Sequence, residues 1–204
     1  MTNLKSVLRS LSAYSTCDVS DALLKLKHPH GGFIPGITMW SPERQQGDTK
    51  IVGPAYTVKF VRNNHENAPK PPQHHIDTIP EGAVVFISAP SGVFNAVYGG
   101  LMSARAQYSG AVFGRDVSSP AYYEVARPSE VNVPLRLSDP RCEITVSPED
   151  IIFADLNGVV CIPRGLVEQV LSLIPKQVEI DENMAKAIAQ GSTFAGASKE
   201  FRGK

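Results

Sequence analysis

The stretch Ser147–Pro163 reads SPEDIIFADLNGVVCIP and predicts a β-hairpin. The apolar runs IIFAD and VVCIP flank Asn157-Gly158, and Asn-Gly between two such runs is a strong signal for a two-residue hairpin turn. Asp150 and Asp155 lie next to the turns, and their spacing does not match an EF-hand calcium loop. We therefore interpret both acids as turn residues.

Helical periodicity marks both ends of the chain. Apolar residues recur at helical spacing from Leu4 to Leu11, and a second amphipathic stretch follows after a short break. Ser15 and Asp18 are the two candidates for the N-cap of this second helix. The helices predicted at the two ends cover residues 4–11, 19–26, 165–173 and 181–190.

Between these helices, β-branched and apolar runs predict strands. Ile51–Val61 reads IVGPAYTVKFV, and Gly53-Pro54 indicates a β-bulge within it. The following residues, 63–73, are rich in proline, asparagine and charge, which is typical of a surface loop.

The middle of the chain predicts three more strands and one helix. Ala83–Ser88 is short and apolar, as in a strand buried on both faces. Residues 101–110 favour a helix that ends at Gly110, and Ala111–Phe113 favours a strand directly after it. Val131–Leu137 predicts another strand, which Pro134 places at a sheet edge. Interspersed strands and helices indicate an α/β fold.

The composition is that of a globular protein without electrostatic bias. The chain has 204 residues, 42% hydrophobic and 20% charged, which provides a core and excludes wholesale disorder. Lys plus Arg and Asp plus Glu each total 20, so no net field attracts nucleic acid or an anionic membrane. The three cysteines form no CxxC pair, and no apolar run is long enough to span a bilayer. We expect a cytoplasmic protein.

The first candidate site is the segment Tyr98–Ser103, which reads YGGLMS. Paired glycines before a helix allow a ligand to approach the backbone, where free N–H groups suit a carboxylate. A structural alternative is that Gly99 and Gly100 only end a loop and cap the helix. Spacing alone leaves both interpretations open.

The second candidate site is Arg115-Asp116, which follows the strand predicted at 111–113. The carboxyl end of a strand is where an α/β sheet usually presents functional side chains. Arginine pairs bidentately with a carboxylate, and one aspartate can hold Mg²⁺ with water in the other positions. A solvated ion pair in a turn is the alternative.

Histidines and cysteines give weaker signals. His74 and His75 would point to opposite faces of a strand, which argues against a shared metal ion. Cys17 and Cys161 have no neighbouring base, so we interpret both as small buried hydrophobes.

Taken in order, several motifs resemble the RraA-like family, which includes 4-hydroxy-4-methyl-2-oxoglutarate aldolases and the regulator of ribonuclease E activity A. The resemblance runs from Ser15 to about Pro175 and is closest to the fungal branch. The motifs that carry it are VSDAL at 19–23, GPAYTV at 53–58, ID at 76–77 with IPEG at 79–82, YGGLM at 98–102 and the hairpin at 147–163.

This resemblance implies a swivelling α/β/β sandwich domain that assembles as a homotrimer or homohexamer, with active sites between subunits. Residues 1–204 would then form a single RraA-like domain with N-terminal helices and a C-terminal helical extension.

The resemblance also implies a lyase that depends on a divalent cation, Mg²⁺ or Mn²⁺. Such aldolases cleave 4-hydroxy-2-oxo acids to pyruvate and also decarboxylate oxaloacetate, because both reactions pass through a pyruvate enolate. Carried over to this sequence, Arg115 is the catalytic residue that polarises the substrate, and Asp116 is the metal ligand. The implied substrate-binding residues are Gly100, Leu101, Met102, Ser103 and Arg115.

One departure from the family pattern affects these roles. The family places the Arg-Asp pair roughly twenty residues after the glycine, with an acid three positions beyond the Asp. Here Arg115 is only 15 residues after Gly100, and Ser119 takes the acidic position. Either a local deletion has moved the catalytic pair, or Gly114-Arg115 ends the strand, residues 116–118 belong to a later segment and the catalytic loop is absent.

Three functions follow. The first is the metal-dependent lyase that acts on a small 2-oxo acid. The second is a non-catalytic regulatory protein that binds a protein partner, which the altered spacing around Arg115 favours. The third is a phosphohistidine carrier, for which His65, His74 and His75 lack the expected glycine-threonine context.

Overall fold

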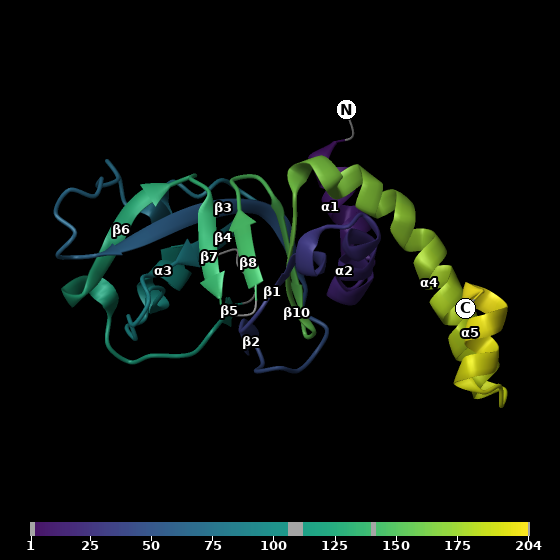
Figure 1. Cartoon of the computed structure of the whole chain (residues 1–204). Coiled ribbons are helices and arrows are strands. Elements are labelled where there is room, and N and C mark those ends of the chain that lie inside the picture. The colour runs from purple at the N-terminus through teal and green to yellow at the C-terminus, as the bar shows by residue number, and fades with distance from the viewer. Residues whose placement is uncertain (1–2, 106–111, 140–141, 204) are drawn as a thin grey trace.

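The structure, a computed structural model, describes residues 3–105, 112–139 and 142–203 (Figure 1). Its α-helices are α1 (Leu4–Ser12), α2 (Thr16–Lys25), α3 (Gly100–Arg105), α4 (Val167–Ala189) and α5 (Phe194–Arg202). Its strands are β1 (Phe33–Ile34), β2 (Thr38–Ser41), β3 (Ile51–Arg62), β4 (Val84–Ser88), β5 (Val112–Gly114), β6 (Ala126–Val131), β7 (Leu135–Asp139), β8 (Cys142–Val146), β9 (Ile151–Asp155) and β10 (Gly158–Ile162).

The long strand β3 organises the main sheet, which has the order β1-β10-β9-β3-β4 with β6 also paired to β3. The first residues of β3 pair antiparallel with β9, the middle ones parallel with β4, and the last ones antiparallel with β6. The bulge predicted at Gly53-Pro54 is wrong, because both residues pair in register with β9. Pro54 is tolerated where β3 changes partners, and the register instead shifts between Lys59 and Phe60.

The predicted hairpin is confirmed as β9 and β10, with Asp155 opposite Gly158. Every residue of both strands is buried. One face packs against α1, α2 and α4, and the other packs against β7 and β8. Burial on both faces explains why these strands read as continuous apolar runs instead of alternating. The layering is the mixed helix and sheet arrangement expected of an α/β/β sandwich.

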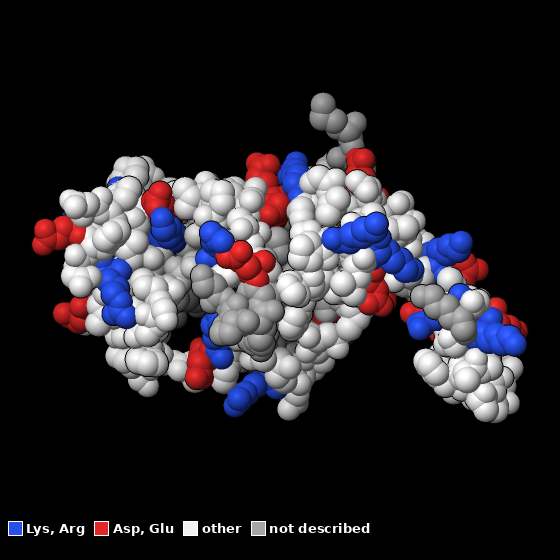
Figure 2. All heavy atoms as spheres, viewed as in Figure 1, with Lys and Arg blue, Asp and Glu red and all other residues white. Residues whose placement is uncertain are grey.

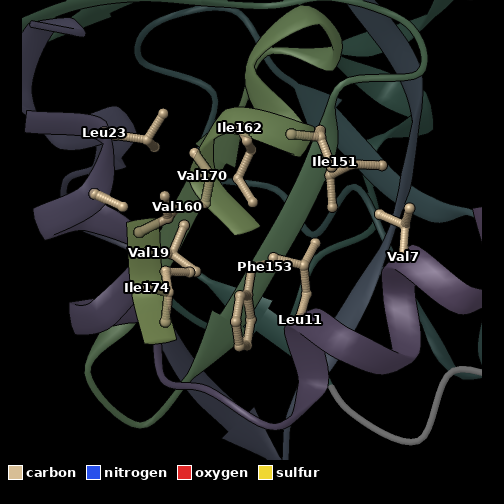
Figure 3. Packing of buried hydrophobic residues seen from close by; sticks show 12 residues of the cluster. Val7, Leu11, Val19, Leu23, Ile151, Phe153, Val160, Ile162, Val170 and Ile174 are labelled. Carbon is tan, nitrogen blue, oxygen red and sulfur yellow. The ribbon is translucent and has the colours of Figure 1, made fainter. Parts of the chain in front are cut away.

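The helical layer is fixed by an apolar cluster that contains Leu11, Val19 and Leu23 of the N-terminal helices together with Phe153 of β9 (Figure 3). Ile174 of α4 completes this cluster and is fully buried. Truncation of such a side chain to alanine typically costs about 2–5 kcal/mol.

Both N-terminal helices are confirmed, and Ser15 is the N-cap of α2. The Ser15 hydroxyl accepts from the Asp18 N–H at 3.2 Å, and the Asp18 carboxylate accepts from the Ser15 N–H at 2.8 Å. Each of the two predicted candidates therefore takes part in one capping box.

The prediction of two separate C-terminal helices is wrong, because α4 continues through Pro175 without interruption. Residues on both sides of the proline are buried, Ile174 and Gln177 among them, and this packing outweighs the lost hydrogen bond. The second half of α4 extends away from the sheet and carries α5 at its end (Figure 1). On the face shown in Figure 2, acidic and basic side chains are interspersed.

Two strand predictions need correction. The predicted strand Val131–Leu137 is divided, because β6 ends at Val131 and β7 begins at Leu135. Pro134 lies between them, where its missing N–H interrupts no ladder. The β4 strand is confirmed, but four of its five residues are only half-buried.

The predicted helix at 101–110 and strand at 111–113 are described only over 101–105 and 112–113, and residues 106–111 lie outside the described chain.

Candidate functional site

The first candidate site lies at the start of α3, after the loop that leaves β4. The Ser103 N–H donates to the Gly99 carbonyl at 2.9 Å, and the Ser103 hydroxyl donates to the same oxygen at 3.3 Å. Gly100 is the first helical residue, and the first N–H groups of a helix have no partner within it.

The glycine pair is not required by the local backbone. Neither Gly99 nor Gly100 has a positive φ, and a Cβ atom on either would meet no atom of the described residues within 4 Å. This differs from Gly32, whose φ is +70° and whose added Cβ would lie 2.3 Å from the Cys161 carbonyl oxygen. The space over Gly99 and Gly100 is therefore open to a molecule outside this chain.

An ion pair anchors α3 to the preceding segment. Arg105 donates through Nε to an Asp77 carboxylate oxygen at 2.8 Å. Asp77 ends the short 3-10 helix η2 (His75–Asp77), which contacts α3. Both side chains are about half exposed, so the pair orients the helix more than it stabilises the fold. Asp77 belongs to the ID motif at 76–77, but the sequence did not indicate that it pairs with Arg105.

The expected substrate-binding residues face solvent in the single chain. Leu101 is 90% exposed, and the nearby Phe94 in the loop before α3 is 83% exposed. Gly100 and Ser103 are also exposed, and Met102 is half-buried. Large apolar side chains at such exposure indicate a surface that contacts another molecule.

The second candidate, Arg115-Asp116, follows β5 on an unbroken backbone. β5 pairs antiparallel with β2 in a two-stranded sheet and not with β4. The Trp40 indole N–H donates to the Gly114 carbonyl at 3.2 Å, which fixes the end of β5. Arg115 and Asp116 are both exposed, and one Asp116 oxygen accepts from the Val117 N–H at 2.8 Å.

The residues available for a metal ion are few. Over residues 3–105, 112–139 and 142–203, no group of three or more His, Cys, Asp or Glu side chains is arranged to hold one. Asp116 has a second carboxylate oxygen besides the one that accepts from the Val117 N–H, and a single carboxylate with water in the other positions can hold Mg²⁺.

The histidine pair differs from its sequence interpretation. His74 and His75 do not point to opposite faces of a strand, because they lie at the start of η2. Their rings are stacked with centroids 4.5 Å apart. The imidazole of His75 is fully buried, and burial followed by the neighbouring His74 lowers its pKa to about 4.

The two described cysteines have different environments. Cys161 is buried as predicted, whereas the prediction for Cys17 is wrong because this residue is exposed on α2. Desolvation, and then the charge of Asp155, raises the pKa of the Cys17 thiol. A raised pKa disfavours the thiolate, so Cys17 has no sign of an activated nucleophile.

Residues 16–112 match the protein-family model described as RraA-like, Aldolase/RraA. This part of the chain is similar to the RraA-like family. The matched region contains β3, β4 and the Gly99-Gly100 pair. It ends three residues before Arg115, so the RraA-like match does not extend to the second candidate site.

One curated relative is the protein DlpA of Legionella pneumophila, which is 28% identical over 97% of this chain. The chain spans about a third (34%) of the length of that protein.

Solved structures share the RraA-like fold. An uncharacterized protein from Pseudomonas syringae pv. tomato superposes with a TM-score of 0.81 and 24% identity, covering 98% of this chain and 96% of the other. RraAS2 of Streptomyces coelicolor, described as an unusual member of the RNase ES inhibitor RraA protein family, superposes with a TM-score of 0.68 and 16% identity, covering 92% and 96%. The likeness to the fungal branch stays a prediction.

In the described part of the chain, no helix combines the length and apolar character needed to cross a membrane.

Proposed function

We propose that this RraA-like protein is a divalent-metal-dependent carbon–carbon lyase that cleaves 4-hydroxy-2-oxo acids to pyruvate and decarboxylates oxaloacetate. The observation that carries the proposal is the open glycine pair at the start of α3, which neither backbone strain nor packing explains. A glycine that neither strain nor packing requires leaves room for a ligand to approach the backbone closely.

In this proposal each candidate residue has one task. The N–H groups of Gly100, Leu101 and Met102 bind the carboxylate of the 2-oxo acid, since the first turn of a helix suits an anion. Arg115 pairs with the substrate and polarises it, and Asp116 holds Mg²⁺ or Mn²⁺. The chemistry that such a cation supplies is electron withdrawal from the bound 2-oxo acid.

The site would be completed in an oligomer. We propose a homotrimer or homohexamer in which a neighbouring subunit covers Phe94 and Leu101, whose apolar side chains are almost fully exposed in the single chain. Light scattering coupled to size exclusion measures the subunit number directly. A monomeric protein at micromolar concentration would reject this part of the proposal.

The deciding experiment measures pyruvate release from 4-hydroxy-4-methyl-2-oxoglutarate and from oxaloacetate, with added Mg²⁺ or with EDTA. The lyase predicts release above background for the protein with Mg²⁺ and its loss with EDTA. Because Mg²⁺ itself promotes oxaloacetate decarboxylation, the control is the same metal concentration without protein. Equal rates of pyruvate release with and without protein, at the same Mg²⁺ concentration, would reject the lyase.

A second function is favoured by the end of the RraA-like match at residue 112, before Arg115 and Asp116. In this alternative the protein is a non-catalytic regulator that binds a protein partner. It predicts background pyruvate release together with inhibition of an RNase E-type ribonuclease. Inhibition is measured as slower cleavage of a labelled RNA, with an unrelated ribonuclease as the control.

A further inference from the structure

Trp40 lies beside the second candidate site, in the two-stranded sheet formed by β2 and β5 (Figure 1). It is the only tryptophan of the chain, and its side chain is half-buried. Its indole N–H donates at 3.2 Å to the carbonyl of Gly114, the last residue of β5. Arg115 and Asp116 are the next two residues, so this bond is made immediately before the pair that the proposed function uses.

The direction of the indole follows from a β-bulge in β2. Met39 pairs with Phe113 and Ser41 pairs with Val112, which leaves Trp40 as the extra residue between the two pairs. A bulge interrupts the alternation of side chains along a strand and re-aims the residue that it adds. Here the re-aimed side chain is the one that reaches the end of β5.

The indole ring and the backbone of Asp116 approach Gly114 together. A Cβ atom on Gly114 would lie 3.5 Å from Trp40 Cδ1 and 3.5 Å from the Asp116 carbonyl oxygen. The space beside the Gly114 Cα is thus bordered by the ring and by the backbone that carries the carboxylate. Trp40 is therefore in contact range of the point where β5 passes into the Arg115-Asp116 pair.

β2 is itself attached to the buried hairpin through Gln45. The Gln45 side-chain oxygen accepts from the Met39 N–H at 2.8 Å, and its amide group donates to the Leu156 carbonyl at 3.3 Å. Leu156 lies in the turn between β9 and β10. Trp40 thus follows a residue that is tied to the most buried strands, and a group carried by rigid elements is placed more precisely than one on a free loop.

The ring makes a second contact that can be removed independently. The Arg44 guanidinium carbon lies 4.2 Å from the centroid of the Trp40 ring, which is a cation–π contact. It uses the face of the ring, whereas the bond to Gly114 uses the N–H at the ring edge. Trp40→Phe removes the N–H and keeps an aromatic face, and Arg44→Met removes the cation and keeps the N–H.

Packing alone would be satisfied by a phenylalanine at this position. What the indole adds is one donor aimed at one carbonyl, as a half-buried tryptophan usually provides. The peptide bond between Gly114 and Arg115 is planar, so a fixed carbonyl fixes the orientation of the whole unit. That orientation sets the point from which the side chains of Arg115 and Asp116 start.

We propose that Trp40 is a positioning residue for Arg115 and Asp116 and acts through the carbonyl of Gly114. This role rests on the proposed function, because Asp116 is taken there as the residue that holds the divalent cation. It does not depend on which 2-oxo acid is cleaved.

The first test measures binding of Mn²⁺ alone to the full chain, with electron paramagnetic resonance counting the free ion. Trp40→Phe should bind Mn²⁺ about three- to tenfold more weakly than the unsubstituted protein, the scale set by one neutral hydrogen bond. Arg44→Met is the matched control and should bind equally or more tightly, because a positive charge is removed. Unchanged affinity in Trp40→Phe, or equal weakening in both variants, would overturn the proposal.

The same titration separates positioning from a loss of folded protein. Fewer folded molecules would lower the number of Mn²⁺ ions bound per chain and leave the affinity unchanged. A displaced Asp116 would instead lower the affinity at the same number of ions per chain. A reduced number of bound ions with unchanged affinity in Trp40→Phe would therefore assign Trp40 a purely structural role.

A second readout uses the single indole N–H resonance in the proton NMR spectrum. Two Cα steps separate Gly114 from Asp116, at most about 7.6 Å, so paramagnetic Mn²⁺ held by Asp116 should broaden the Trp40 resonance. Asp116→Asn should prevent this broadening. Broadening that persists in Asp116→Asn, or an unsubstituted protein that binds no Mn²⁺, would overturn both the positioning role and the assignment of Asp116.

Failure of the lyase and failure of the positioning role give different results. Mn²⁺ binding that depends on Asp116 and Trp40, with pyruvate release at background, would reject the lyase and support the positioning role. Metal-dependent pyruvate release with unchanged Mn²⁺ affinity in Trp40→Phe would support the lyase and overturn the positioning role.

Discussion

Asp155 binds Thr16 through both of its carboxylate oxygens. The Thr16 hydroxyl donates to one oxygen at 2.6 Å and the Thr16 N–H donates to the other at 2.8 Å. The Asn157 N–H donates to the first oxygen as well, at 2.8 Å. Asp155 therefore stabilises the hairpin turn and also attaches the start of α2 to the end of β9, a role that its interpretation as a turn residue did not include.

Asp155→Asn should destabilise the protein by about 1–3 kcal/mol, because an amide group cannot accept all three bonds and its N–H₂ would be buried without an acceptor. Chemical denaturation followed by circular dichroism measures the change. Asp181→Asn is the matched control, since Asp181 forms an exposed pair with Arg202 and should change stability by less than about 1 kcal/mol. Equal effects of the two substitutions would contradict this role for Asp155.

Gly100→Ala should leave the fold intact or stabilise it by about 0.5–1 kcal/mol, since the added Cβ meets nothing and alanine favours the helix. If α3 binds substrate, the same change should raise the KM for pyruvate release. Gly32→Ala is the contrast, because its Cβ would collide with the Cys161 carbonyl oxygen and should lower the thermal midpoint. An unchanged KM in Gly100→Ala would argue against close approach of the substrate.

Asp116→Asn should remove metal-dependent pyruvate release if Asp116 is the metal ligand. The expected loss is at least about a hundredfold in kcat, equivalent to about 2.7 kcal/mol of transition-state stabilisation. Asp48→Asn, at an exposed aspartate elsewhere, is the control for a general charge effect. Full activity in Asp116→Asn would show that another residue holds the metal.

The Asp77–Arg105 pair should affect catalysis more than stability. Each single change, Asp77→Asn or Arg105→Gln, should cost less than about 1 kcal/mol of folding free energy because both side chains are about half exposed. If the pair orients α3, each change should also raise the KM for the 2-oxo acid. The double variant with Asp77→Arg and Arg105→Asp, which exchanges the two charges, should bring the KM part of the way back. A KM in the double variant as high as in the single variants would contradict a positioning role.

Stability should fall as the pH is lowered from about 6.5 to about 4, through His75. Burial lowers the pKa of His75 to about 4 from the ordinary value of 6.5, so the unfolded chain binds a proton that the folded chain excludes. The expected loss in the free energy of unfolding is about 2 kcal/mol once solvent screening is allowed for, and it levels off below pH 4. The free energy of unfolding, measured by urea denaturation at each pH, should depend less on pH in His75→Phe than in the unsubstituted protein. An equal pH dependence in the two proteins would exclude His75 as the source.

Much of the architecture was predictable because its signals are local. Asn157-Gly158 between two apolar runs defines the hairpin, and the periodicity from Leu4 to Leu11 defines α1. The prediction of two separate helices at 165–173 and 181–190 failed. Pro175 does not end α4, because packing on both sides of it supplies more free energy than the proline removes.

The candidate site was predictable only in part. The glycine pair at 99–100 carried a motif, and its position at the start of α3 agrees with the expectation. The Asp77–Arg105 pair gave no signal, since its two residues are 28 positions apart and a single sequence does not reveal which charges meet. For the same reason, the spacing around Arg115 did not predict that β5 would pair with β2.

The sequence by itself determined the two N-terminal helices, the hairpin and the likeness to the RraA-like family, because turn chemistry and apolar periodicity act between near neighbours. Only the tertiary structure decided that Asp155 holds Thr16, that α4 is continuous and that the ring of His75 is buried. These features depend on which distant segments share the interior, and that choice is made by the free energy of the whole packed chain.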